Sequence, residues 1–190
     1  MKIGILAIQG DFELHRKALT SLSVDSLFVR SSKDLDNIRA LILPGGESTT
    51  MSLLMNKFDL FNSIKKFSNN FNLFGTCAGA ILMSADSGDR RVKNLGVIDV
   101  FSKRNSWGAQ IDSFSDFINL NKDEILSDKF YATFIRGPRF SKVSKDCKII
   151  GHYKNDPVLI RNDKHLISSF HPEIGKDLSV YKYFINMINE

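Results

Sequence analysis

The sequence predicts an α/β fold of three layers, with helices on both faces of a mainly parallel sheet that has an antiparallel extension. Two observations favour this class. The first half of the chain alternates short apolar runs with segments of helical spacing, which is the βαβ order of parallel sheets. The second half contains mostly strand-like segments, as an antiparallel extension requires. No repeat, low-complexity tract or linker interrupts the chain, so we expect a single domain over residues 1–190.

The composition is that of a globular protein with 43% hydrophobic and 25% charged residues in 190. No apolar run approaches the roughly 20 residues of a membrane span, and the start of the chain is too short for a signal peptide. The two cysteines exclude a disulfide scaffold and favour a reducing compartment, so we expect a cytoplasmic protein with no membrane partner. The net charge of +5 permits a nucleic-acid partner, but the basic residues are scattered, and we expect none.

The elements of the first half follow from apolar periodicity. Residues 2–8 are nearly all apolar, which is typical of a strand buried on both faces. Helical spacing of apolar residues follows over 12–22, with Asp11 as the expected N-cap. The other predicted elements are strands at 26–29, 40–43 and 71–76, a brief helix or turn at 34–38, and helices at 50–55, 58–67 and 78–83.

The second half is expected to be mostly antiparallel. Residues 110–118 alternate apolar and polar side chains, as a half-exposed strand does. Residues 161–164 form a polar hairpin turn, and 180–188 show helical spacing. Further strands are predicted at 94–101, 130–135, 148–153, 157–160 and 165–170.

The strand-to-helix junction at residues 75–79 carries the first chemical motif. Gly75 and Gly79 flank Cys77 in the G-x-nucleophile-x-G pattern of a tight strand-to-helix turn. A helix N-terminus favours the thiolate, and the N–H of Ala78 would point at an oxyanion formed beside the sulfur. A small buried cysteine at an ordinary turn is the alternative, and this motif alone leaves it open.

Two further loops also follow predicted strands. The Pro-Gly-Gly-Glu-Ser-Thr loop at 44–49 has adjacent glycines that let the backbone approach a ligand. A plain turn is the alternative, and a phosphate loop ranks low because the P-loop spacing and its lysine are missing. His171 and Glu173 form the other loop, in which the histidine would be a base and the glutamate its orienting acceptor. A surface His-Glu pair is the alternative interpretation.

Carboxyl ends of parallel strands share one edge of a sheet, so these three loops are expected to meet. Together they predict a Cys-His-Glu triad for acyl transfer through a thioester, with an amide or ester substrate. The remaining histidines are poorer bases: His15 lies on a helix with Glu13, His152 lies inside a strand, and His165 is next to a turn. A metal site is not expected, because neither paired-cysteine nor H-E-x-x-H spacing occurs.

These motifs resemble those of the class I (triad) glutamine amidotransferases. The resemblance lies in Gly-Thr-Cys-Ala-Gly at 75–79, Pro-Gly-Gly-Glu-Ser-Thr at 44–49 and Phe-His-Pro-Glu at 170–173. The stretches 4–11, 104–114 and 134–138 are similar to one branch, the PdxT family of glutaminase subunits of pyridoxal 5′-phosphate synthase. The likeness spans nearly the whole chain.

The resemblance implies hydrolysis of L-glutamine to glutamate and ammonia. Cys77 would attack the carboxamide, His171 would be base and then acid, and Glu173 would orient His171. Gly46 and Ala78 would provide the oxyanion hole. The residues that would hold glutamine are Gly46, Glu47, Ser48, Arg104, Ile135 and Arg136.

A guanidinium suits the α-carboxylate of glutamine because it can pair with both oxygens, and a surface ion pair is the alternative for Arg104 and for Arg136. The family further implies a (β/α)8 synthase partner in a hetero-oligomer. This partner receives the ammonia, and Gln9 and Gly10 would lie toward it. The resemblance also implies little activity without the partner, and a peptide flip at residues 45–46 is one physical route to activation. We expect no cofactor in this subunit.

The sequence departs from the family pattern at Ala109, where arginine is usual, at Gly137, where alanine is usual, and over 139–146. These departures concern substrate contacts or docking and leave the triad intact. Two other hypotheses remain: a peptidase with the same triad, and a non-catalytic binding subunit. The stretches around Arg104 and Arg136 argue against the first, and the intact triad argues against the second.

Overall fold

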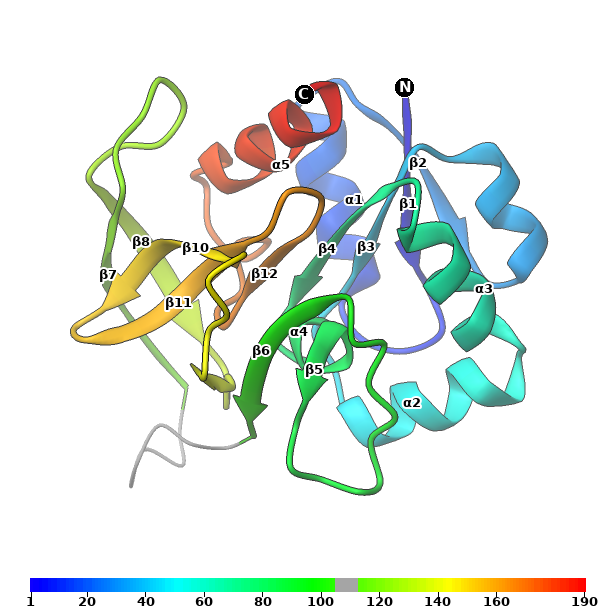
Figure 1. Cartoon of the computed structure of the whole chain (residues 1–190). Coiled ribbons are helices and arrows are strands. Elements are labelled where there is room, and N and C mark those ends of the chain that lie inside the picture. The colour runs from blue at the N-terminus through cyan, green and yellow to red at the C-terminus, as the bar shows by residue number, and fades with distance from the viewer. Residues whose placement is uncertain (105–112) are drawn as a thin grey trace.

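A mixed sheet forms the centre of the computed structural model, which describes residues 1–104 and 113–190 (Figure 1). Within those residues its nine strands have the order β2-β1-β3-β4-β12-β11-β10-β7-β8. The pairings from β2 to β12 are parallel, and those from β12 to β8 are antiparallel. The bounds are β1 Lys2–Leu6, β2 Asp25–Val29, β3 Ala40–Leu43, β4 Asn72–Thr76, β7 Phe114–Leu120, β8 Lys129–Phe134, β10 Lys148–Tyr153, β11 Asp156–Arg161 and β12 Leu166–Ser168.

Helices cover both faces of this sheet, which confirms the predicted three-layer α/β class. The strand β3 shows why: Leu41 and Leu43 pack into one hydrophobic cluster, and Ala40 and Ile42 pack into the other. Burial on both faces accounts for the continuous apolar runs of the first half. One face carries α1 (Phe12–Ser21) and α5 (Ser179–Asn189), and the other carries η1 (Ser32–Asn37), α2 (Ser48–Lys57), α3 (Leu60–Ser68) and α4 (Ala78–Met83) (Figure 1).

Local hydrogen bonds move several boundaries from their predicted places. The helix α2 begins at Ser48 rather than residue 50, because the Glu47 carboxylate accepts hydrogen bonds from the N–H groups of Thr49 and Thr50. Asp11 occupies the N-cap position of α1, but its side chain makes no capping hydrogen bond. The predicted strand 110–118 falls partly on residues 110–112, outside the described residues, and β7 runs from Phe114 to Leu120.

A second described sheet of three strands lies beside α4, in the order β5 (Ser84–Asp86), β6 (Ile98–Lys103) and β9 (Arg139–Ser141). The strands β5 and β9 are absent from the predicted elements, because they have three residues each and little periodicity to detect. The predicted start of β6, at residue 94, is too early. The N–H groups of Leu95, Gly96 and Val97 bond instead to carbonyls of residues 82–84 at the end of α4.

The parallel strands β3, β4 and β12 are neighbours, so their carboxyl ends lie at one edge of the sheet. This edge receives the loop after Leu43, the turn at Cys77 and the loop after Ser168. The three predicted loops therefore start from adjacent strands, as expected from the sequence. Across residues 1–104 and 113–190, none of the helices has the length and apolar character to span a membrane.

Candidate active site

The turn at Cys77 has a strained backbone that only its flanking glycines permit. Cys77 has φ 47° and ψ −104°, and its N–H donates to the carbonyl of Ser168 at 2.9 Å. A Cβ on Gly75 would lie 2.7 Å from the carbonyl carbon of Gly79, and one on Gly79 would overlap the carbonyl oxygen of Leu43. Both glycines are thus required by close approach of backbone to backbone. The Cys77 side chain is buried, with Sγ 3.8 Å from the carbonyl oxygen of Ile135.

His171 and Glu173 form a buried hydrogen-bonded pair beside this turn. Nδ1 of His171 lies 2.6 Å from Oε1 of Glu173, and the backbone N–H of His171 donates to the carbonyl of Thr133 at 2.8 Å. Burial alone would lower the pKa of His171, but the neighbouring Cys77 and Glu173 raise it to about 10. Nε2 of His171 is buried and has no hydrogen-bond partner among the described residues. The imidazolium form is therefore favoured at neutral pH, with its second nitrogen available to the site.

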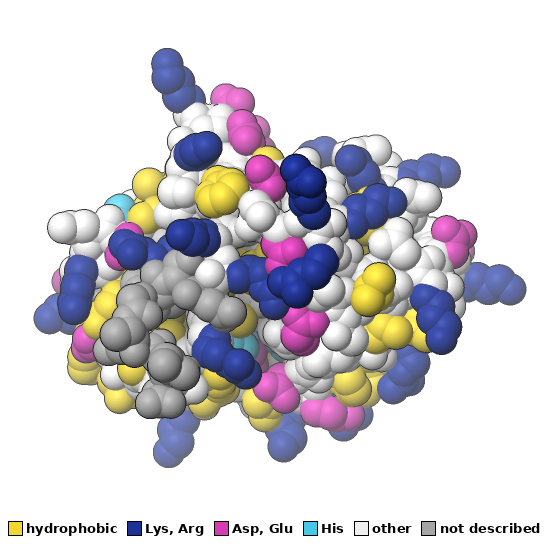
Figure 2. Space-filling view, turned by 90° about the horizontal axis from the view of Figure 1, so that it is seen from below, with side chains coloured by type: hydrophobic (Ala, Val, Ile, Leu, Met, Phe, Trp, Pro, Cys, Tyr) yellow, Lys and Arg dark blue, Asp and Glu magenta, His cyan; other side chains and the backbone are white. Residues whose placement is uncertain are grey.

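The predicted site residues line one cavity of about 370 Å³ at this edge of the sheet. Figure 2 shows this face of the molecule, with a hollow that has histidine atoms at its bottom and basic and acidic side chains around it. Among the predicted residues, Glu173 alone does not line the cavity, because it lies behind His171. The lining residues are Gln9, Asp11, Gly46, Glu47, Ser48, Cys77, Ala78, Ile81, Arg104, Ile135, Arg136 and His171.

Arg104 is engaged in ion pairs on the wall of this cavity. Its guanidinium lies 2.7 Å from Glu47 Oε1 and 2.8 Å from Asp89 Oδ2, and it donates to Thr49 Oγ1 at 2.9 Å. Burial opposes ionisation of Glu47, but hydrogen bonds from Thr50 and Thr49 lower its pKa to about 2. Sequence reasoning missed Asp89, which lies in a polar turn that carries no signal of a site.

Arg136 lies in the connection between β8 and β9 and has a positive φ of 48°. The next residue, Gly137, is one of the departures from the family pattern. A Cβ there would overlap the carbonyl oxygen of Ser169 and lie 3.1 Å from its hydroxyl. Glycine thus allows residues 136–138 to pack closely against the start of the loop that carries His171. The other departure, Ala109, lies outside the described residues.

His15 lies next to the site, although the sequence predicts only a poor base on a helix with Glu13. In the structure, His15 is fully buried and its Nε2 lies 3.6 Å from Glu173 Oε1. Its position three residues after Phe12 and four before Leu19 places it on the apolar stripe of α1. A histidine on such a stripe requires a buried polar partner. This requirement is the feature of the sequence that indicates a buried polar contact for His15.

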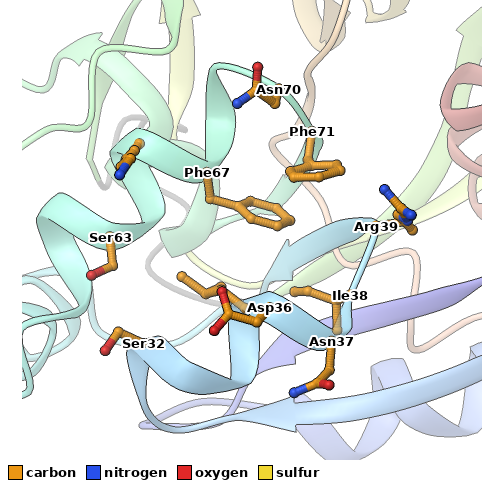
Figure 3. Close-up of a pocket in the computed structure, with 11 residues that line it drawn as sticks. Ser32, Asp36, Asn37, Ile38, Arg39, Ser63, Phe67, Asn70 and Phe71 are labelled. Carbon is orange, nitrogen blue, oxygen red and sulfur yellow. The ribbon is translucent and has the colours of Figure 1, made fainter.

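A larger cavity of about 690 Å³ lies elsewhere, between η1 and α3 (Figure 3). Phe67 and Phe71 stack at 4.6 Å between ring centroids along its wall, and Arg39 lies over Phe71. Arg39 precedes β3 and Phe71 precedes β4, so this cavity is at the amino ends of the strands, away from the triad. None of the predicted site residues lines it. Among the described residues, no cluster of three or more His, Cys, Asp or Glu side chains could hold a metal ion.

Comparisons with known proteins find similar chains over nearly the full length. The family described as "SNO glutamine amidotransferase family" matches residues 5–190. The chain is 40% identical to "Pyridoxal 5'-phosphate synthase subunit PdxT" of Thermosipho africanus over 100% of both chains. It is also 40% identical to the protein of the same name from Thermotoga neapolitana, over 99% of this chain and 100% of that one.

Among solved structures, the chain is similar to one described as "Crystal structure of glutamine amidotransferase", with a TM-score of 0.92, 34% identity and 99% of both chains covered. A structure of PurLQS from Thermotoga maritima matches with a TM-score of 0.73 over 97% of both chains. At 13% identity, that second likeness concerns the fold alone.

Proposed function

Since the chain belongs to the SNO glutamine amidotransferase family, we propose that it is the glutaminase subunit of a pyridoxal 5′-phosphate synthase. In this role it hydrolyses L-glutamine to L-glutamate and ammonia. The observation that carries the proposal is the placement of Cys77 and His171 in one cavity, with Glu173 bonded to His171 from behind. Relatives matched over their full length carry the name of that synthase subunit.

The reaction follows from the protonation states of the pair. The Cys77 thiolate attacks the side-chain carboxamide carbon of glutamine, and the His171 imidazolium donates its Nε2 proton to the departing nitrogen, which leaves as ammonia. Neutral His171 then removes a proton from water, which attacks the thioester carbonyl. Glutamate leaves, and the thiolate and imidazolium are restored. Glu173 holds the His171 tautomer and stabilises its charge through the 2.6 Å hydrogen bond.

Two backbone groups would serve the oxyanion. Ala78 is the first residue of α4, so its N–H has no partner within the helix. Gly46 lines the cavity from the loop after β3, and a Cβ on its neighbour Gly45 would collide with the His171 ring. Glycine at 45 therefore lets the loop pass close to the imidazole. Donors placed in this way stabilise charge that develops in the transition state.

Glutamine binding is assigned to the polar wall of the cavity. Arg104 would pair with the α-carboxylate of glutamine, and Glu47, Ser48, Ile135 and Arg136 complete the lining. Because Arg104 is already paired with Glu47 and Asp89, substrate must share or replace one of these contacts. The affinity for glutamine therefore depends on how strongly Glu47 and Asp89 hold the Arg104 guanidinium.

The partner is proposed to be a (β/α)8 synthase that receives the ammonia. Residues before α1 connect such a partner to the oxyanion loop: the Asp11 N–H donates to the Gly45 carbonyl at 3.3 Å, and Gln9 Oε1 accepts from the Glu47 N–H at 2.9 Å. A partner that contacts Gln9 and Gly10 would therefore act directly on the peptide between Gly45 and Gly46. This connection supports activation of the glutaminase on assembly.

The test is glutamate release from glutamine by the purified chain, alone and with the co-purified synthase subunit. Activity is expected with the partner, little without it, and none in Cys77→Ala. The matched control is Cys147→Ala, since Cys147 lies outside the cavity and should leave turnover unchanged. Full turnover by Cys77→Ala would contradict the assignment of the nucleophile, and high activity of the isolated chain would contradict activation by the partner.

A diazo-ketone analogue of glutamine separates the enzyme from a non-catalytic subunit. We expect covalent modification at Cys77, with Cys147 unmodified, as read by peptide mass mapping. A chain that binds without catalysis would not react with this electrophile.

A further inference from the structure

A second histidine contacts the glutamate of the proposed triad. Oε1 of Glu173 lies 2.6 Å from Nδ1 of His171 and 3.6 Å from Nε2 of His15, and the side chains of His15 and Glu173 are fully buried. We propose that His15, held by Tyr181, is a positioning residue that fixes the Glu173 carboxylate against His171. The inference rests on the proposed glutaminase function and adds residues of α1 and α5 to its machinery.

The hydrogen bonds of His15 determine which nitrogen carries its proton. The hydroxyl of Tyr181 lies 2.7 Å from His15 Nδ1, and burial raises the pKa of Tyr181 well above its usual value, so the phenol stays protonated and donates. Burial also lowers the pKa of His15, which favours the neutral ring. A neutral imidazole that accepts at Nδ1 carries its proton on Nε2. This nitrogen lies within hydrogen-bond distance of Thr76 Oγ1, at 3.3 Å, and in polar contact with Glu173 Oε1, at 3.6 Å.

This cluster joins four elements of the fold behind the cavity. His15 belongs to α1, Tyr181 to α5, Thr76 to the end of β4, and Glu173 to the loop after β12. The helices α1 and α5 lie on the same face of the sheet, which brings Tyr181 to His15 (Figure 1). Thr76 immediately precedes Cys77. The same buried imidazole therefore contacts the strand that carries the nucleophile and the carboxylate that orients the base.

The charges around Glu173 set the expected pH effect. Burial disfavours its ionised form, whereas the hydrogen-bonded His171 imidazolium favours it, and the pKa of Glu173 is below its ordinary value. A neutral His15 adds to this only through the polar contact of its Nε2 with Oε1 of Glu173 at 3.6 Å. The other titratable groups involved are Tyr181 from α5, which donates to His15, Cys77, which acts on His171, and Asp11 from the start of α1, which acts on His15. Removal of the His15 N–H would make the ionised carboxylate of Glu173 less stable and less firmly held. The Glu173 carboxylate would then stabilise the His171 imidazolium less. Cys77 would then be less reactive toward an electrophile at a given pH, because the neighbouring positive charge that favours its reactive form is weaker.

The test compares His15→Phe, which keeps a ring without the N–H, with His15→Gln, whose amide can donate from a similar position. The pH dependence of Cys77 alkylation by iodoacetamide is read by peptide mass mapping, with Cys147 as an internal reference. In His15→Phe the acid limb should move up by about 0.5–1 pH unit, because the polar contact that is lost, 3.6 Å long, is weaker than a direct hydrogen bond to the carboxylate. Glutaminase kcat with the synthase subunit should fall by about 10- to 100-fold with little change in KM.

His15→Gln should restore most of the wild-type profile, and Tyr181→Phe should give an intermediate shift, because it frees the His15 tautomer. The matched control is His165→Gln. His165 is also buried, but its Nδ1 accepts from the Leu73 N–H at 3.2 Å and it is not part of this cluster. Its substitution should leave the acid limb in place even if it lowers stability.

An unchanged acid limb in folded His15→Phe, or a Gln variant no better than Phe, would overturn the proposal. If His15→Phe does not fold, Tyr181→Phe decides: a wild-type profile in that variant overturns the proposal, and a shifted acid limb supports it. Alkylation needs no substrate, so it still tests His15 if the wild-type complex releases no glutamate. That last outcome would instead count against the proposed function.

Discussion

Gly79→Ala is expected to destabilise the fold and impair catalysis together. The added Cβ would overlap the carbonyl oxygen of Leu43, and it would lie 2.7 Å from the carbonyl carbon and 2.9 Å from Cβ of the same residue. Two of these atoms are buried backbone at the end of β3, which cannot move aside as a flexible side chain would. Overpacking costs about 1–3 kcal/mol, and a backbone obstacle places this substitution near 3 kcal/mol. Alanine returns about 1 kcal/mol through its helix propensity, which leaves a net loss of about 2 kcal/mol.

For a chain of 190 residues this loss corresponds to a fall in Tm of about 4–8 °C. Urea unfolding measures the free energy, and calorimetry measures Tm. The matched control is Gly175→Ala, whose Cβ would have its nearest neighbour, the Asp177 nitrogen, at 3.9 Å. Because Leu43 leads into the loop with Gly46, Gly79→Ala should also lower glutaminase kcat. Stability within about 0.5 kcal/mol of wild type, with unchanged kcat, would refute the requirement for glycine in the tight turn.

Three further substitutions test the electrostatics of the site. Glu47 has a pKa of about 2 in the folded chain against an ordinary 4.5, so its contribution to stability is present above pH 4.5 and is lost as the pH falls toward 2. Glu47→Gln should therefore flatten the pH dependence of the unfolding free energy over that interval. Arg104→Lys should raise KM for glutamine about tenfold with a smaller change in kcat, because a lysine cannot form the bidentate pair; an unchanged KM would remove Arg104 from the substrate site. Glu173→Gln should lower the pKa of His171 from about 10, as followed by NMR titration, and reduce kcat about 100-fold or more at neutral pH. A His171 titration identical to that of wild type would show that Glu173 does not stabilise the imidazolium.

The parallel half of the fold could be predicted because its strands are buried on both faces. Continuous apolar runs such as 40–43 are typical of strands in that environment, and the glycine pairs mark where backbones approach. The meeting of the loops after Leu43, Thr76 and Ser168 then followed from the common direction of their strands. The small second sheet was less accessible, since its strands β5 and β9 have only three residues each and depend on tertiary contacts.

Site residues that act through other residues were harder to find. Asp89 lies fifteen positions before Arg104 in the sequence, and nothing in its polar turn distinguishes this turn from a solvated one. His15 and Tyr181 lie 166 residues apart in sequence, and only packing brings them together. Sequence patterns identify residues that need a special local backbone, as Cys77 does. They do not identify partners that are distant in sequence and come into contact only in the folded chain.

The first turn of α1 has a mechanical consequence for activation. Asp11, at its start, contacts the Gly45 carbonyl through its backbone N–H, and His15, one turn later, contacts Glu173. A helical turn advances only about 5.4 Å, so both contacts belong to one short rigid body. A small rotation of α1 would displace the oxyanion loop and the orienting carboxylate simultaneously. Placement of the loop at Gly45 and orientation of Glu173 thus both depend on the position of α1. Substitutions on the outer surface of α1 therefore offer a way to adjust activation without altering the cavity.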